Sequence, residues 1–142
     1  MLYLHPAAQI LAMLLMVYAL VLAWPRLLTL HLGPKRRFNR QRHILVGETA
    51  LGLMLAGAVG GAVMVRLYWR GWFLTGDHFW LALAMLPFLL FGLGSGLHMA
   101  RSPQVRKVLP ALHGLNNLVL LALAILQIGE GREVIEHFIR GG

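Results

Sequence analysis

The feature that most constrains this chain is a set of four apolar segments, each long enough to cross a lipid bilayer. A helix needs about 20 residues to span a hydrocarbon core about 30 Å thick. Backbone polar groups inside lipid must be satisfied within the segment, so each segment should be a helix. We expect these helices at residues 6–30, 44–65, 79–100 and 108–128. The sequence therefore predicts an all-α integral membrane protein, an up-down four-helix bundle.

Composition agrees with a membrane protein of one domain. Of the 142 residues, 58% are hydrophobic and 13% are charged, against roughly 45–50% apolar and about 25% charged in soluble domains. We expect a bundle over residues 1–129 and a short tail, amphipathic or frayed, over residues 130–142. The first residues lack a basic region and a small-residue cleavage site, so the first segment should remain as a helix. Because the chain has no cysteine, disulfides, thiolate-bound zinc, iron–sulfur clusters and covalently attached haem are excluded.

The basic residues indicate an orientation in the membrane. They lie between the apolar segments, so the net charge of +8 is not the footprint of a nucleic-acid-binding protein. Nine of them flank the first and third loops, and four flank the second loop and the tail. Since basic loops stay in the cytoplasm, we expect a multi-pass protein of the bacterial inner membrane with both termini outside.

Four histidines recur near the starts of the four predicted helices. They are His5, His43, His78 and His113, at spacings of 38, 35 and 35 residues. In an up-down bundle the first and third helices are diagonal to each other, and so are the second and fourth. His5 and His78 are thus expected to face each other in the outer half, and His43 and His113 in the inner half. Each pair could supply the axial ligands of one haem b, giving two haems per chain.

The helical faces that continue from these histidines are expected to point into the core, and two of them carry glycines. Gly57 and Gly61 of the second segment should lie level with the outer pair of histidines. Gly92 and Gly96 of the third segment should lie level with the inner pair. Small residues allow something flat or bulky to approach a membrane helix closely. An alternative remains open, since helix-terminal histidines are often interfacial and glycine-rich faces are often plain helix-packing seams.

Other polar residues could support such sites. Asp77 precedes His78, and Asn116 and Asn117 follow His113; any of them could accept the second imidazole proton. Glu48 is an acid inside an apolar span, which makes it a functional candidate or an interfacial residue. His98 should face outward near the inner surface, whereas the other two histidines lie in a loop and in the tail. Haem propionates could bind basic residues at either end: Arg40, Arg42, Arg106 or Lys107 inside, and Arg66 or Arg70 outside.

Five short motifs add a resemblance to a known family. They are LHP at 4–6, RQRH at 40–43, DHFW at 77–80, LHGLNN at 112–117 and AILQIGEG at 124–131. With them the chain resembles the four-helix core of the cytochrome b561 family, and the small bacterial membrane families related to it. The resemblance implies that the His-Pro histidine is a haem ligand, that ligands pair across alternate helices, and that the function is transmembrane electron transfer. The chain lacks the flanking helices and the ascorbate-binding signature of the animal and plant members.

Three functions follow as hypotheses. The first is a b-type cytochrome that relays electrons between a cytoplasmic donor or a quinone and an outer acceptor, such as a periplasmic cytochrome. The second is an accessory or assembly subunit of a larger membrane complex, with haem absent or structural and with the glycine pairs as protein contacts. The third is an enzyme that acts on a quinol or superoxide. It ranks below the other two because no residue specifies a substrate.

Overall fold

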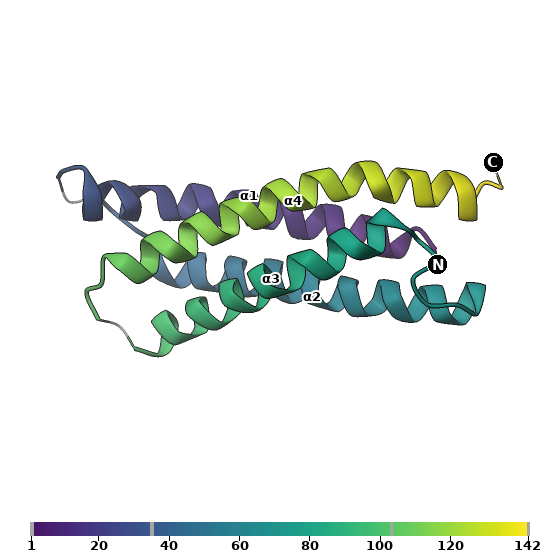
Figure 1. Cartoon of the computed structure of the whole chain (residues 1–142). Helices are drawn as coiled ribbons and strands as arrows, with labels where there is room; N and C mark the ends of the chain where they lie inside the picture. Colours follow the sequence, from purple (N-terminus) through teal and green to yellow (C-terminus); the bar gives the residue numbers. More distant parts are fainter. Residues whose placement is uncertain (1, 35, 103, 142) are drawn as a thin grey trace.

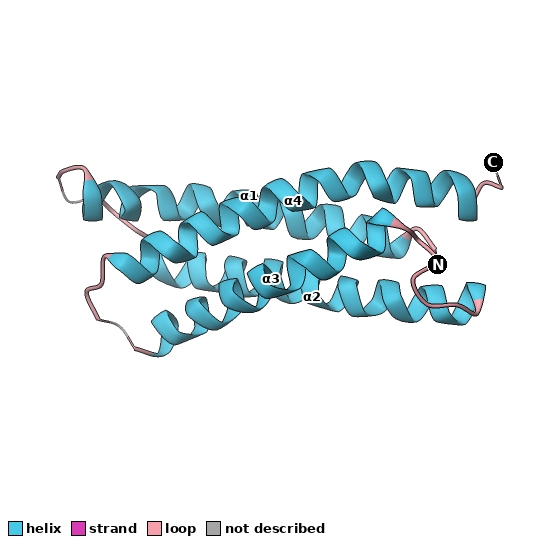
Figure 2. Ribbon diagram, in the orientation of Figure 1, coloured by secondary structure: helices cyan, strands magenta, loops and turns pink. Residues whose placement is uncertain are grey.

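The structure of the chain, a computed structural model, is an all-α four-helix bundle with no strand in the part that it describes. It describes residues 2–34, 36–102 and 104–141. The helices are α1 (Leu4–His31), α2 (Arg40–Trp69), α3 (Asp77–Arg101) and α4 (Val108–Phe138). All four are long and apolar enough to cross a membrane. The predicted fold class and the four predicted spans are thus confirmed (Figure 2).

The helices run alternately up and down, so that each packs against its neighbours in sequence. α1 contacts α2 and α4, and α3 contacts α2 and α4. The two ends of the chain lie at the same end of the bundle as the α2–α3 connection, and the other two connections lie at the opposite end (Figure 1). The diagonal partners are therefore α1 with α3 and α2 with α4, as the alternating topology predicts.

The core of the bundle is narrow and lies between the two ends. It is built from small and flexible side chains on the predicted inward faces, which are Ala12, Met16, Ala50, Met54, Leu89, Leu120 and Ala124, together with Leu51. Many large apolar side chains on the opposite faces are exposed, among them Leu14, Val21 and Leu90. Contiguous apolar surface of this kind is unfavourable in water and favourable in lipid. The outward faces are thus suited to acyl chains.

The helices are longer than the apolar segments, and α4 shows this most. At 1.5 Å per residue its 31 residues extend about 46 Å, well beyond the hydrocarbon core. The helix continues through the segment that the sequence separates as a tail at residue 130. At this end the rings of Trp69 in α2 and Phe138 in α4 lie 5.1 Å apart, centroid to centroid. The tail is therefore a projecting end of α4 that packs against α2.

Local signals explain where α2 and α3 begin. The Asn39 side chain accepts a hydrogen bond from the Arg42 backbone N–H at 3.1 Å, which caps one free donor at the start of α2. α3 starts after Gly76, whose φ of 56° favours glycine. Pro87 lies inside α3 without ending it.

Candidate functional site

The outer pair of histidines comes together across the bundle. His5 lies in the first turn of α1, and His78 lies in the first turn of its diagonal partner α3. Both side chains are half-buried. Their ring centroids lie 6.3 Å apart and their ring planes cross at 77°. The two imidazoles therefore face the interior at one level instead of pointing to lipid.

The inner pair repeats this arrangement on the other two helices. His43 lies near the start of α2 and His113 near the start of α4. Their ring centroids lie 6.5 Å apart, with ring planes at 80°. Since α2 and α4 are also diagonal partners, both pairs bridge the core. The structure thus brings together the four histidines in the two pairs expected from their spacing.

The two pairs occupy different halves of the bundle. The Nδ1–H of His43 donates to the backbone carbonyl of Ala19 in α1, at 3.0 Å. Ala19 follows His5 by fourteen residues on the same helix, which corresponds to about 21 Å along the axis. A hydrocarbon core is about 30 Å thick. One pair therefore belongs to each half of such a core.

The four predicted glycines lie against these two levels. A Cβ on Gly61 would lie 2.9 Å from Cε1 of His5, and a Cβ on Gly96 would lie 3.3 Å from Cε1 of His113. Gly57 lies against the amide of Gln9, and Gly92 lies against the amide of Asn117. The glycines thus give room to the imidazoles and to the amides one turn away from them. These side chains occupy the space beside the four glycines.

One further glycine was missed by the sequence reasoning. A Cβ on Gly131 of α4 would lie 3.4 Å from Cε1 of His78. The motif QIGEG contains this residue, yet the expected boundary at residue 130 placed it in the tail and outside the bundle. Because α4 continues as a helix, Gly131 reaches the outer pair.

A hydrogen-bonded network surrounds the inner pair. The Oγ of Ser95 in α3 lies 2.8 Å from Nδ1 of His113, and Nδ2 of Asn117 donates to Nε2 of the same ring at 3.1 Å. Asn116 instead donates to the carbonyl of Phe88, at 2.8 Å. Asn117 was expected near His113, whereas Ser95 was not singled out. In the run GLGSG, Ser95 looks like one more small packing residue. It follows Gly92 by three residues, so helical periodicity places it on the same inward face, and this was the signal that could have found it.

The outer pair lacks the supporting acid that the sequence suggested. Asp77 is exposed, and the Nδ1 atoms of His5 and His78 are buried without a hydrogen-bond partner in the described structure. Adjacent helical residues point about 100° apart, so Asp77 turns away from the ring of His78. Gln127 of α4 approaches here instead, and its Nε2 donates to the backbone carbonyl of His78 at 2.7 Å.

The basic residues proposed for propionates make other contacts. Arg40 donates to the carbonyls of Met99 and Ala100 at the end of α3, at 3.1 and 2.7 Å. The guanidinium of Arg42 lies over the ring of Tyr18, 5.5 Å from its centroid. Arg70 is an exposed residue with a left-handed backbone conformation at the end of α2. A role for Arg42 and Arg70 in cofactor binding stays a prediction.

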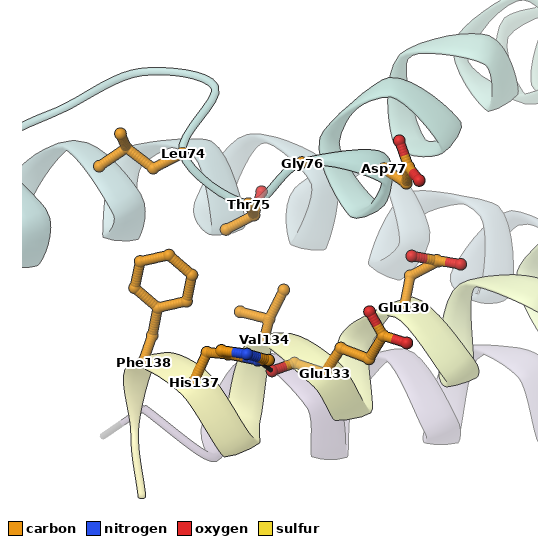
Figure 3. Close-up of a pocket in the computed structure, with 9 residues that line it drawn as sticks. All are labelled: Leu74, Thr75, Gly76, Asp77, Glu130, Glu133, Val134, His137 and Phe138. Atoms are coloured by element: carbon orange, nitrogen blue, oxygen red, sulfur yellow. Dashed lines mark hydrogen bonds between the residues drawn. The ribbon is translucent and has the colours of Figure 1, made fainter. Parts of the chain in front are cut away.

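Two other polar candidates lie outside the bundle interior. His98 and Glu48 are exposed on their helices. His31 is the last residue of α1. His137 in α4 lines an open pocket of about 330 Å³ at the end of the bundle that carries the termini. Three carboxylates share this pocket, those of Asp77, Glu130 and Glu133 (Figure 3).

The donor set at the two levels restricts the kind of metal that they could hold. Among the described residues, no group of three or more His, Cys, Asp and Glu side chains could hold a metal ion. Structural zinc needs four ligands, and catalytic zinc needs three protein ligands. Two imidazoles facing each other suffice only where another molecule supplies the remaining ligands. A porphyrin does so, because it supplies four nitrogens in a plane and leaves two axial positions for histidine.

Comparisons of the chain with protein-family models, with curated protein sequences and with solved structures found no match. The site must therefore be interpreted from its own geometry and chemistry.

Proposed function

We propose that this protein is a membrane-embedded b-type cytochrome that holds two haems and carries electrons across or within the membrane. His5 and His78 would hold the outer haem, and His43 and His113 would hold the inner haem. The observation that carries the proposal is the pair of ring separations, 6.3 and 6.5 Å. The resemblance of the short sequence motifs to the cytochrome b561 family supports it.

These separations fit a metal held between two imidazoles. A zinc–imidazole bond is about 2.0–2.1 Å long, so two imidazoles that hold one metal ion from opposite sides place their ring centroids about 6 Å apart.

The protein's contribution is ligation, orientation and burial. Haem iron, when bound, would supply one-electron redox chemistry, with a potential set by its ligands and surroundings. The carbonyl of Ala19 accepts the Nδ1 proton of His43, which leaves its Nε2 lone pair for a metal. The apolar middle of the bundle, with Met16, Met54 and Leu120, keeps water out between the two levels.

The accessory-subunit hypothesis is weakened by where the glycines lie. It requires the Gly57–Gly61 and Gly92–Gly96 pairs to be surfaces for another protein. Instead, their missing side chains are replaced by groups of the same chain, those of Gln9, His5, Asn117 and His113. These two seams are therefore not available to a partner.

The location and the partners follow from the same proposal. With nine basic residues at the end of the first and third loops and four at the other, positive-inside orientation puts the termini and the His5–His78 pair on the outer side of a bacterial inner membrane. Electrons would pass between a donor or a quinone and an outer acceptor such as a periplasmic cytochrome. Lipid would cover the exposed apolar faces.

The test is a visible spectrum with haem quantitation. Protein purified in mild detergent from haem-replete cells should give b-type absorption bands on reduction with dithionite. A pyridine haemochrome assay should give two haems per chain. A colourless preparation, or one whose colour is lost during gel filtration without loss of the folded protein, would contradict the proposal.

A further inference from the structure

Ser95 is a buried polar residue placed against one of the four histidines. It lies in α3, where its side chain is 8% exposed, and it faces α4 across the interface between the two helices. Its Oγ lies 2.8 Å from Nδ1 of His113. The same oxygen lies 2.6 Å from the backbone carbonyl of Phe91 and 3.3 Å from that of Gly92.

The hydroxyl has a single proton, and the neighbouring groups decide where it goes. A carbonyl oxygen is only an acceptor, so a separation of 2.6 Å from Phe91 is favourable only if Ser95 donates its proton there. The remaining lone pairs of Oγ can then only accept. His113 must therefore donate, which places its proton on Nδ1 and leaves Nε2 unprotonated.

A second contact is consistent with the same assignment. The Nδ2 group of Asn117 is a donor, and it lies 3.1 Å from Nε2 of His113. Such a contact needs a lone pair on Nε2, and a metal bound to Nε2 would replace it. His43, on the other side of the core, has the same tautomer, because its Nδ1 lies 3.0 Å from the carbonyl of Ala19. Both members of the inner pair thus carry an unprotonated Nε2.

We infer that Ser95 is a positioning residue for the inner haem: it holds His113 as the Nδ1–H tautomer and presents Nε2 to the iron. The inference rests on the proposed function, since it takes haem iron as the metal. A hydrogen bond from the distal nitrogen of a ligating histidine increases the basicity of the ligand. A more basic ligand stabilises ferric over ferrous iron, so Ser95 lowers the midpoint potential of the inner haem.

The outer pair of histidines differs from the inner pair, which confines the predicted effect of Ser95 to the inner haem. Among the described residues, Nδ1 of His5 and Nδ1 of His78 have no hydrogen-bond partner, so no side chain of that part of the chain acts there as Ser95 does. Loss of the Ser95 hydroxyl should change the inner haem alone. The outer haem then acts as an internal reference in the same sample.

The experiment is a spectroelectrochemical titration of purified Ser95→Ala, with haem quantitation on the same material. Ser95→Ala should keep two haems and raise one of the two midpoint potentials, leaving the other unchanged. A tenfold loss of preference for ferric iron at that site corresponds to about 59 mV for one electron. Ser95→Thr, which retains the hydroxyl, should restore the lower potential.

The matched control is Thr49→Ala. Thr49 donates to the carbonyl four residues earlier in α2, at 2.8 Å, as Ser95 does in α3, but it is exposed and makes no hydrogen bond to a histidine ring within the described structure. Both potentials should stay unchanged in this variant. If Ser95→Ala loses one haem while Ser95→Thr and Thr49→Ala retain two, the positioning role also stands.

The inference is overturned if Ser95→Ala retains two haems with both potentials unchanged, or if Ser95→Thr behaves like Ser95→Ala. Neither result touches the proposed function, because the haems are still bound. A wild-type protein without haem refutes the proposed function itself, so the two failures are distinguishable.

Discussion

At the scale of single residues, the glycines beside the histidines set the room available to each imidazole. Gly96 is in contact with the ring of His113, whereas nothing lies within 4 Å of a Cβ placed on Gly94, two residues earlier in α3. The same contrast exists in α2 between Gly61, which contacts the ring of His5, and Gly60. A side chain at Gly96 or Gly61 must displace an imidazole, whereas one at Gly94 or Gly60 would point away from it.

Gly96→Leu should therefore lose the inner haem and keep the outer one. The added side chain would push His113 from its position, and a displaced ligand cannot complete the axial pair with His43. The measurement is the haem content per chain, expected to fall from two to one. Gly94→Leu, with the same added volume on the lipid side, should retain two. Equal haem content in the two variants would mean that contact with His113 is not what Gly96 provides.

Single residues also show which features of the site could be predicted from the sequence. The inward faces followed from the spacing of three and four residues, because helical geometry fixes which residues share a face. Asp77 was wrong as a partner of His78, since neighbours in sequence point in different directions on a helix. Ser95 could not be assigned to His113, because that contact depends on the register of α3 against α4, which no periodicity within one helix reveals.

At the scale of the elements, α3 is the shortest helix and is tied at both ends to its neighbours. Gln127 of α4 holds the carbonyl of His78 at its start. Arg40 of α2 donates to the carbonyls of Met99 and Ala100 in its last turn, where free carbonyls and the negative end of the helix dipole favour a cation. These contacts fix the position of α3 along the bundle axis, and with it the positions of His78 and Ser95.

Arg40→Ala should lower the thermal stability of the bundle modestly. It removes two hydrogen bonds to the end of α3, but the group is exposed, so the loss should be small, with the apparent melting temperature falling by about 1–4 °C. The measurement is loss of helical circular dichroism on heating in detergent. The control is Arg37→Ala, which removes the same charge from an exposed site in the connection just before α2 and should leave the melting temperature unchanged. A larger loss in the control would show that loop charge matters more than the contact with α3.

The lengths of the elements illustrate a different limit of sequence analysis. The four spans were found because apolar runs are a strong signal, but the ends were placed where the apolar run stops. α4 continues for ten residues beyond Ile128, through Gly129 and Gly131. Glycine is only mildly unfavourable in a helix, and contacts such as that of Phe138 with Trp69 outweigh this cost. Such contacts depend on the position of α2, so they were invisible from the segment itself.

At the scale of the whole molecule, charge and topology together distinguish the two ends of the bundle. The termini and the α2–α3 connection share one end (Figure 1), and the basic residues are concentrated at the other. The acids are mostly at the end with the termini, where Asp77, Glu130 and Glu133 line one pocket. In the proposed orientation the cytoplasmic end is cationic, and the outer end carries most of the acidic groups.

The orientation can be measured by labelling, because the chain has no cysteine of its own. A membrane-impermeant maleimide added to intact cells should label Leu74→Cys, in the α2–α3 connection. It should label Gln104→Cys, in the α3–α4 connection, only after the membrane is opened. Both positions are exposed, so accessibility in the folded protein is matched. The reverse pattern would place the arginine-rich end outside and contradict the positive-inside assignment.

The most direct test of the central claim is the haem content of two double variants. His5→Ala/His78→Ala removes both members of one proposed pair and should retain one haem per chain. His5→Ala/His43→Ala removes one member from each pair and should retain none. If the first variant retains none, or the second retains one, the four histidines do not act as the two diagonal pairs described here.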